Sequence, residues 1–348
     1  MAKVNFNIVN TPMIALAREA RGLYQHELAQ YIDVSSATLS KIETGELGVS
    51  QELITIIAQV LKFPLDFFYQ SGETVEPNLS YRKRDKVAQK LLSPIEAWVN
   101  IYRLNIQQLF KACSFEPAKI PHLDISVYGS PQAVANKLRS LWKVERGAID
   151  NMVELLESHH IPVVSFHFNT ERVDGRSILT ETMQPIIFIN RMSLGDRQRF
   201  TLAYELGHLV MHLFAAPDFE RDVRHEANLF AAEFLMPEKD IKSDLKQSKL
   251  TLTRLAELKR KWKVSMQAVL YRADDLGIIT DNQKRYTLEQ FNAMKIRKRE
   301  PQELDVPKEH ATLIRNLMTK YKSAQKNNIN EIAAFFHLSE EEFVLRYT

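Results

Sequence analysis

The stretch DRQRFTLAYELGHLVMH occupies residues 196–212, and its pattern predicts one long helix that carries polar groups suited to a metal site. Positions 204 and 208 are four residues apart, so their side chains share one face of that helix. Zinc peptidases use two histidines at this spacing, with a glutamate between them as the general base. Here the first position is Tyr204, the second is His208 and the intervening acid is Glu205.

The sequence on both sides of this helix resembles the ImmA/IrrE family of metallopeptidases. The helix is followed by HEANLFAAEFLMP at 225–237, and the similarity extends from about Pro131 to Ile279. It includes RSLWKVERGAIDNMVELLESHHIPVV before the site, VDGRSILTETMQPIIFIN as the sheet, and LAELKRKWKVSMQAVLYRADDLGII after it. The resemblance implies an α+β zincin-like domain with zinc as cofactor. It also implies Glu205 as general base, with His208 and Glu226 as metal ligands.

Tyr204 is the departure from that family, whose helix reads HELGH where this chain reads YELGH. A phenol is a poor zinc ligand beside imidazole, so bound zinc is in doubt and Tyr204 has no certain role. His212 lies four residues beyond His208, so that pair could hold a metal one turn further along. Glu205 would then lie on the wrong turn to activate the metal-bound water, and we expect the metal site to be degenerate.

Three interpretations of this half of the chain stay open. The first is a metal-free or inactive zincin fold that senses a small-molecule signal or a protein partner. The second is a zinc-dependent, site-specific endopeptidase with an altered coordination sphere, which cleaves a repressor or another partner protein. The third is a purely structural role for the histidines. We favour the first, which leaves enzymatic activity uncertain and leaning towards inactive.

Near the N-terminus, the chain predicts a group of short helices punctuated by turn residues. Residues 25–32 predict one helix, YIDVS a tight turn, and residues 35–43 a second helix, the arrangement in which the second helix enters a DNA major groove. The segment from Ala20 to Phe68 resembles the XRE, or lambda-repressor-like, helix-turn-helix family. The turn glycine usual in that family is Asp33 here, which tolerates left-handed geometry acceptably.

The XRE resemblance implies which residues contact a double-stranded DNA operator. Where the family often has glutamine this chain has Ser36, so bidentate recognition of adenine is lost there. The residues expected to face DNA are Ser36, Ala37, Thr38 and Lys41, with Gln25, Arg18 and Arg21 near phosphates.

The charge of this N-terminal part is unfavourable for DNA binding by a single copy. Residues 1–73 hold five basic side chains against eight acidic ones, and affinity for phosphates grows with the number of neutralising contacts. A homodimer, which a two-fold operator favours, or help from the basic run between Arg82 and Lys90 would compensate. The alternative is a small helical domain used for protein contact.

The remaining sequence gives a predominantly helical chain with one small sheet. Residues 161–190 contain β-rich runs broken by VDGR and by Gln184-Pro185, which predict a small antiparallel sheet, and the chain beyond Arg299 predicts a last pair of helices. We therefore expect four parts: a helix-turn-helix domain at 1–73, a helical connector at 74–130, a zincin-like domain at 131–290 and a helical extension at 291–348.

Composition is compatible with a cytoplasmic regulator. The formal net charge of +3 is mildly basic, and the single cysteine, Cys113, excludes an internal disulfide and fits a reducing compartment. No apolar stretch approaches the roughly 20 residues that span a bilayer, so we expect no membrane partner. We expect a DNA-binding transcriptional regulator whose zincin-like domain senses a ligand or a partner.

Overall fold

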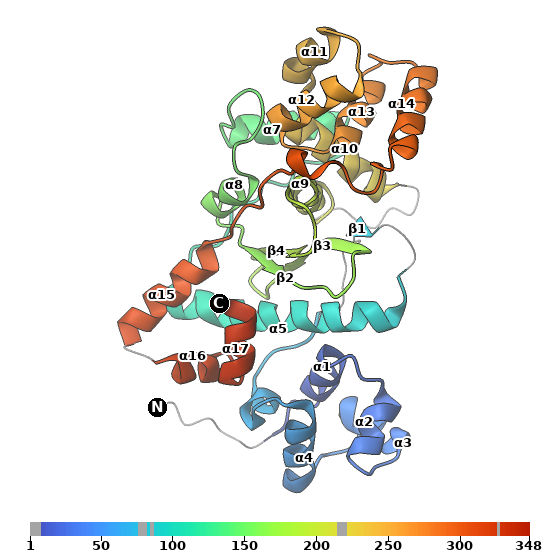
Figure 1. The fold of residues 1–348 in the computed structure, drawn as a ribbon. Coiled ribbons are helices and arrows are strands. Elements are labelled where there is room, and N and C mark those ends of the chain that lie inside the picture. Colours follow the sequence, from blue (N-terminus) through green and yellow to red (C-terminus); the bar gives the residue numbers. More distant parts are fainter. Residues whose placement is uncertain (1–7, 76–81, 84–86, 214–220, 326–327) are drawn as a thin grey trace.

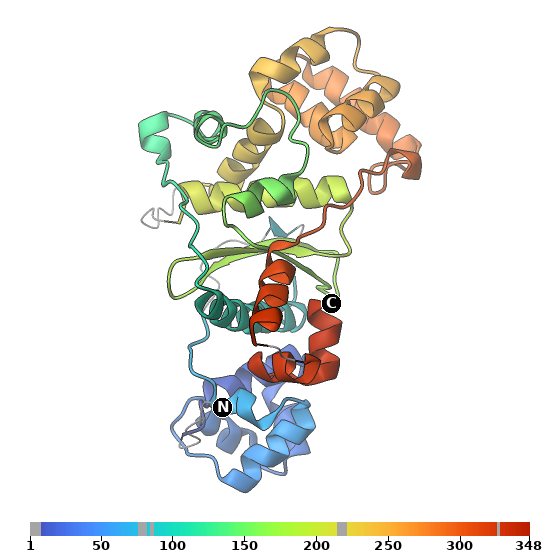
Figure 2. The same ribbon diagram turned by 90° about the vertical axis from the view of Figure 1, so that its left-hand side faces the viewer.

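A long central helix, α5 (Gln89–Cys113), separates an N-terminal helical domain from a small sheet and a second helical layer (Figure 1). The computed structural model describes residues 8–75, 82–83, 87–213, 221–325 and 328–348. The mainly helical fold with a small sheet is confirmed. Seen from the side, the sheet lies between α5 and the long helix α9 (Gly195–Met211), with the N-terminal domain beyond α5 (Figure 2).

The N-terminal domain has the expected helices and turn. Asp33 has a φ of +52°, so the left-handed turn predicted from the sequence is present. The side chain of Ser35 accepts a hydrogen bond from the backbone N–H of Thr38, which caps the second helix of the motif. The elements are α1 (Pro12–Ala20), α2 (Gln25–Tyr31), α3 (Ser36–Glu43), α4 (Gln51–Leu61) and the 3-10 helix η1 (Leu65–Tyr69).

The sheet has the order β1-β3-β4-β2, and it is mixed instead of antiparallel as the sequence predicted. β3 and β4 pair antiparallel, but β2 and β4 run parallel, with Val163 opposite Ile187. β2 precedes β3 in the chain yet pairs with β4, and the run patterns in the sequence do not specify such a pairing. The strands are β1 (Arg82–Lys83), β2 (Val163–Phe166), β3 (Val173–Leu179) and β4 (Pro185–Asn190).

The VDGR segment, predicted as a break, is the first half of β3. Its Asp-Gly pair resembles a turn signal, but here the glycine permits close packing of α9 on the sheet. A Cβ at Gly175 would collide with the Thr201 side chain and lie 2.9 Å from the carbonyl oxygen of Phe188. On the other side of α9, a Cβ at Gly207 would lie 2.9 Å from the Phe230 ring, so α10 (Val223–Leu235) also packs closely.

Two hydrophobic cores hold the molecule together. One unites the N-terminal domain, α5, one face of the sheet and the C-terminal helices, and the other fills the region around α9 and α10. The C-terminal part ends in three helices, not the pair that the sequence predicted. Among the described residues, no helix is long and apolar enough to cross a bilayer. The other helices are α6 (Ile125–Tyr128), α7 (Pro131–Leu141), α8 (Met152–Ser158), α11 (Glu238–Lys246), α12 (Leu252–Trp262), α13 (Met266–Asp275), α14 (Asp281–Ala293), η2 (Gln302–Leu304), α15 (Leu313–Gln325), α16 (Ile329–Phe335) and α17 (Glu340–Tyr347).

Candidate functional site

The metal-site candidates on α9 and α10 lie together and form a chain of hydrogen bonds. The Nδ1 atoms of His208 and His212 are 2.8 Å apart, and Nε2 of His212 is 2.8 Å from Oε2 of Glu226. Arg221 donates to both carboxylate oxygens of Glu226, at 3.0 Å from Nε and 2.8 Å from Nη2. The residues singled out from the sequence therefore lie close together, and the tertiary structure adds the guanidinium of Arg221, which the sequence did not predict.

This chain of contacts determines which histidine nitrogen carries the proton. If His212 is neutral and donates to Glu226 through Nε2, its Nδ1 must accept from the Nδ1–H of His208. That tautomer leaves Nε2 of His208 with a bare lone pair, and Nε2 has no hydrogen-bond partner among the described residues. A buried imidazole nitrogen of this kind can serve as one metal ligand. A catalytic zinc site needs three ligands from the protein, so this nitrogen alone is not enough.

Burial and neighbouring charge keep these histidines neutral. Burial is the main cause that lowers the pKa of His208 to about 3, and electrostatic interaction with His212 and Arg224 adds to it. Burial also lowers the pKa of His212, although Glu226 opposes that shift. For Glu226, burial raises the pKa, but hydrogen bonds from Arg221 and His212 outweigh burial and the net pKa is lowered. The carboxylate is therefore ionised, and Arg221 balances its charge.

Glu205 and Tyr204 are buried at the position where a hydrolytic zincin holds its general base and first histidine. Glu205 is fully buried, and its Oε2 accepts a hydrogen bond of 2.8 Å from the hydroxyl of Ser177 on β3. The rings of Tyr204 and His208 meet edge to face, with centroids 4.7 Å apart. Position 204 is thus next to the His208 ring, as the i, i+4 spacing predicts, but it presents a phenol instead of an imidazole.

The residues present do not fit a catalytic zinc ion. A metal at Glu226 would have to displace the bidentate Arg221 and would meet its positive charge, and His208 is hydrogen-bonded to His212 instead of converging with it on a common point. Over the described part of the chain, no three histidine, cysteine or acidic side chains are placed to hold a metal ion. Ser177 and Arg221 carried no metal-site signal in the sequence, because one lies on a neighbouring strand and the other before α10.

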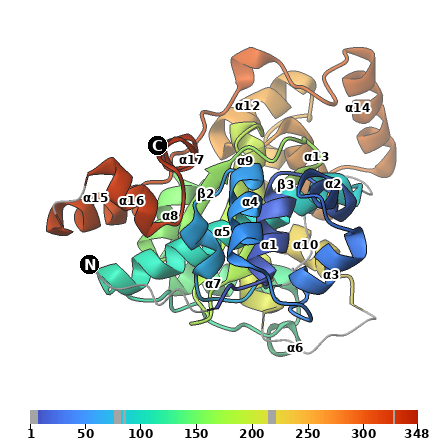
Figure 3. The same cartoon turned by 90° about the horizontal axis from the view of Figure 1, so that it is seen from below.

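The expected DNA-reading residues lie on an open face of α3. Ser36, Ala37 and Lys41 are exposed and Thr38 is half-buried, so the four lie on the solvent-facing side of the helix. Figure 3 views the molecule from this end, with α1 to α4 nearest the reader. The geometry suits the entry of α3 into a major groove.

The three residues expected near phosphates are instead engaged within the protein. Arg18 is buried and pairs with Glu43, with Nε 2.7 Å from Oε1. Gln25 donates to the other oxygen of the same carboxylate at 2.8 Å. Arg21 donates to the carbonyl of Leu61 and pairs with Glu342 of α17 at 2.7 Å. These contacts fix the domain, and contact of these side chains with phosphate stays a prediction.

Two family models match separate parts of the chain. A helix-turn-helix family model matches residues 14–68, and the IrrE N-terminal-like domain matches residues 156–274. One relative is the radiation response metalloprotease IrrE of Deinococcus radiodurans, 33% identical over 97 residues. That match covers 25% of this chain and 30% of the relative, so the two proteins share less than a third of the relative's length.

Proposed function

Because the chain joins a helix-turn-helix domain to an IrrE N-terminal-like domain, we propose that it is a DNA-binding transcriptional regulator. In this proposal the IrrE-like domain responds to a ligand or a protein partner and does not hydrolyse peptides. The protein acts as a homodimer, because operators of such domains are commonly two-fold.

The observation that carries this proposal is that the two sides of the helix-turn-helix domain have different surroundings. Its recognition helix faces solvent, while its opposite side is fixed to the rest of the chain. The indole Nε1 of Trp98 on α5 donates to the carbonyl of Ala20 at 3.2 Å, and Nδ1 of His337 lies 3.1 Å from Asp66. With the Arg21–Glu342 pair, these contacts join the DNA-reading end to α5 and α17. A conformational change in α5 or α17 can therefore alter how the helix-turn-helix domain contacts DNA.

The hydrogen-bonded donor set supports the non-hydrolytic part of the proposal. Arg221 supplies the positive charge next to Glu226 that a metal would otherwise supply. Since Arg221 neutralises the carboxylate and Tyr204 occupies the position of the first histidine, we expect the domain to fold without zinc. In this proposal the IrrE-like domain transmits the effect of a bound ligand or partner and is not an enzyme.

DNA binding is tested by footprinting the region upstream of the chain's own gene. We expect protection by the wild type and much weaker protection by Lys41→Ala, because Lys41 is an exposed cation on the recognition helix. Lys239→Ala, which removes an exposed lysine on α11, is the matched control and should protect normally. If Lys41 contacts a phosphate, its loss also lowers the slope of log K against log salt by about 0.9. No protection by the wild type would contradict the proposal, and equal protection by all three proteins would contradict the placement of Lys41 against DNA.

The alternative is a zinc-dependent endopeptidase, and the placement of Glu205 favours it. Glu205 is buried at the general-base position and is oriented by Ser177, as a working base would be. The test is cleavage of a candidate repressor, or of the chain itself, with and without added zinc. Cleavage that needs zinc and is abolished by Glu205→Gln would replace the non-hydrolytic proposal with this one.

A further inference from the structure

A cavity of about 300 Å³, with neither His208 nor His212 in its lining, lies between the end strand of the sheet and the C-terminal helices. Its walls come from β2, the end of β4, the segment before α15, α15 itself and α17. Half-buried Val164, Ile314 and Met318 line its apolar part, and Ser165 contributes a hydroxyl. The cavity therefore combines an apolar wall with a polar edge, the usual composition of a small-molecule site.

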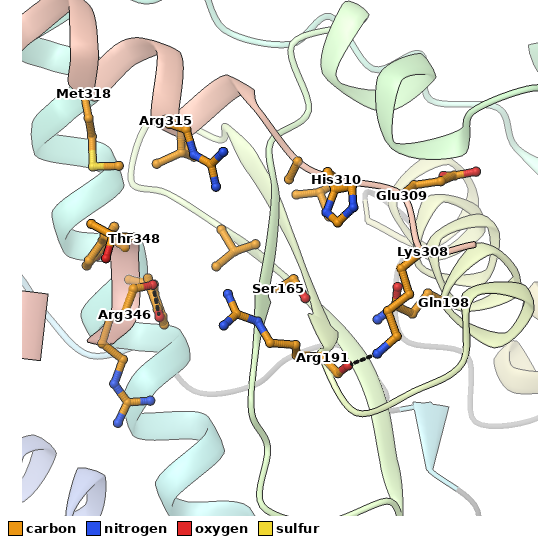
Figure 4. A pocket seen from close by; sticks show the side chains of 16 residues that line it. Ser165, Arg191, Gln198, Lys308, Glu309, His310, Arg315, Met318, Arg346 and Thr348 are labelled. Carbon is orange, nitrogen blue, oxygen red and sulfur yellow. Dashed lines mark hydrogen bonds between the residues drawn. The ribbon is translucent and has the colours of Figure 1, made fainter. Parts of the chain in front are cut away.

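The polar side chains around this cavity are predominantly cationic. Figure 4 shows the guanidinium groups of Arg191 and Arg315 and the ring of His310 turned toward the same space beside Ser165. Lys308 lies alongside, with Nζ 2.6 Å from the carbonyl oxygen of Arg191. Arginine, with its planar fork of donors, suits phosphate and carboxylate groups particularly well.

These cations are not neutralised within the described part of the chain. Neither Arg191 nor Arg315 makes an ion pair with any described acidic residue. The acidic residue on the cavity wall, Glu309, is directed away from it and pairs with Arg199 (Figure 4). Oε2 of Glu309 also accepts from the backbone N–H of Val153 at 2.9 Å. The cavity thus gathers positive side chains that no described acidic side chain neutralises.

We propose that this cavity binds a small metabolite that carries a diphosphate group. Arg191, Arg315 and Lys308 together bring three positive charges, which matches a diphosphate better than a single carboxylate. The volume is at the lower end of the range of about 300–1,000 Å³ for ligand pockets, so the ligand is small. The apolar wall of Val164, Ile314 and Met318 accommodates its uncharged part.

The cavity is also positioned to influence the helix-turn-helix domain, a consequence that rests on the proposed function. Its wall includes α17, whose Glu342 pairs with Arg21. The guanidinium of Arg346 on the same helix stacks on Trp98 at 3.7 Å from the ring centroid, and the hydroxyl of Tyr102 donates to the carbonyl of Arg346 at 3.1 Å. A ligand that shifts α17 therefore shifts the contacts that fix the DNA-reading end.

The experiment is calorimetric titration of the full chain with inorganic pyrophosphate. We expect the wild type to bind with a Kd below about 1 mM, and the double variant Arg191→Gln/Arg315→Gln to bind at least about ten-fold more weakly. Arg260→Gln, which removes an exposed arginine on α12, is the matched control and should bind as the wild type does. Citrate, an anion with carboxylates alone, should bind more weakly than pyrophosphate.

Three outcomes would overturn the diphosphate site: no pyrophosphate binding by the wild type, equal binding by the double variant, or citrate binding as tightly as pyrophosphate. Displacement of pyrophosphate by duplex DNA of unrelated sequence would also overturn it, because the cations would then serve DNA backbone contact. The titration needs no operator, so its failure is distinguishable from failure of the proposed function. If pyrophosphate binds but leaves operator affinity unchanged, the site stands and the coupling to the helix-turn-helix domain is refuted.

Discussion

A histidine in place of Tyr204 is expected to strengthen zinc binding, because it adds the ligand that a phenol supplies poorly. The ring of Tyr204 already lies edge to face against His208, at 4.7 Å between centroids. In the tautomer set by His212, Nε2 of His208 presents a bare lone pair to the interior. An imidazole at position 204 would then add a second ligand beside His208, and Glu226 would become the third on leaving Arg221 and His212.

The gain in affinity follows from the number of ligands. Structural zinc sites with four protein ligands contribute about 10–16 kcal/mol, so one ligand is worth about 3 kcal/mol, or about a hundred-fold in Kd. Arg221 opposes metal binding equally in the wild type and in Tyr204→His, so its effect cancels in that ratio. Removing it with Arg221→Ala is expected to add a further ten- to hundred-fold, roughly, because a charge-assisted hydrogen bond of about 1.5–3 kcal/mol no longer holds Glu226.

Zinc affinity is best measured by competition with a chromophoric chelator, since Tyr204→His removes volume from a buried position and so changes stability as well. Tyr204→Phe is the matched control, because it keeps the aromatic ring and supplies no ligand. Tyr204→His should bind one zinc per chain about a hundred-fold more tightly than either the wild type or Tyr204→Phe.

Two results would refute this reasoning. Tight stoichiometric zinc binding by the wild type would mean that Arg221 leaves Glu226 readily and that the present donors suffice. A Tyr204→His protein that binds zinc no better than Tyr204→Phe would mean that position 204 does not face the same point as His208. Either result would also remove the main support for a non-hydrolytic domain.

Three further predictions concern stability and are checked by equilibrium urea unfolding. Burial raises the pKa of Glu342, but hydrogen bonds from Arg346 and Arg21 outweigh burial and the net pKa is lowered. The stabilisation from these ion pairs is therefore fully present above the unfolded pKa of about 4.3 and is lost as pH falls through the folded pKa. Glu342→Gln should therefore lose less stability than the wild type between neutral pH and acid pH, and parallel pH profiles would contradict this. Lys259→Met leaves two buried carboxylates, those of its ion pairs, without their partner and should destabilise by about 3–5 kcal/mol; a loss under about 1 kcal/mol would show that the ion pairs are dispensable. Asp33→Gly relieves a left-handed residue at φ +52° and should stabilise by about 0.5–1 kcal/mol, whereas any loss of stability would point to a contact made by the aspartate.

The local sequence pattern was enough to predict most of the helices, the helix-turn-helix motif and the zincin-like helix. The 3.6-residue period of the helices, the Asp33 turn and the YELGH segment depend on neighbours in sequence, so they could be read without coordinates. The same spacing placed Tyr204 beside His208. The sequence also predicted Ser36, Ala37 and Lys41 as surface residues of the recognition helix, because their positions on that helix are fixed by its cap and period.

Contacts between distant segments were decided only by the tertiary structure. The VDGR segment became strand because Gly175 is needed where α9 crosses the sheet, and the parallel pairing of β2 with β4 follows from the order of the strands in space. Arg21 meets Glu342, 321 residues further along the chain. Periodicity shows which face of an element is apolar. It does not show which other element covers that face or which charged residues that element brings close. The sequence by itself thus determined most of the helices and the residue types of the candidate site. The partners of its charged groups, Arg221 at Glu226 above all, became fixed only when the chain packed.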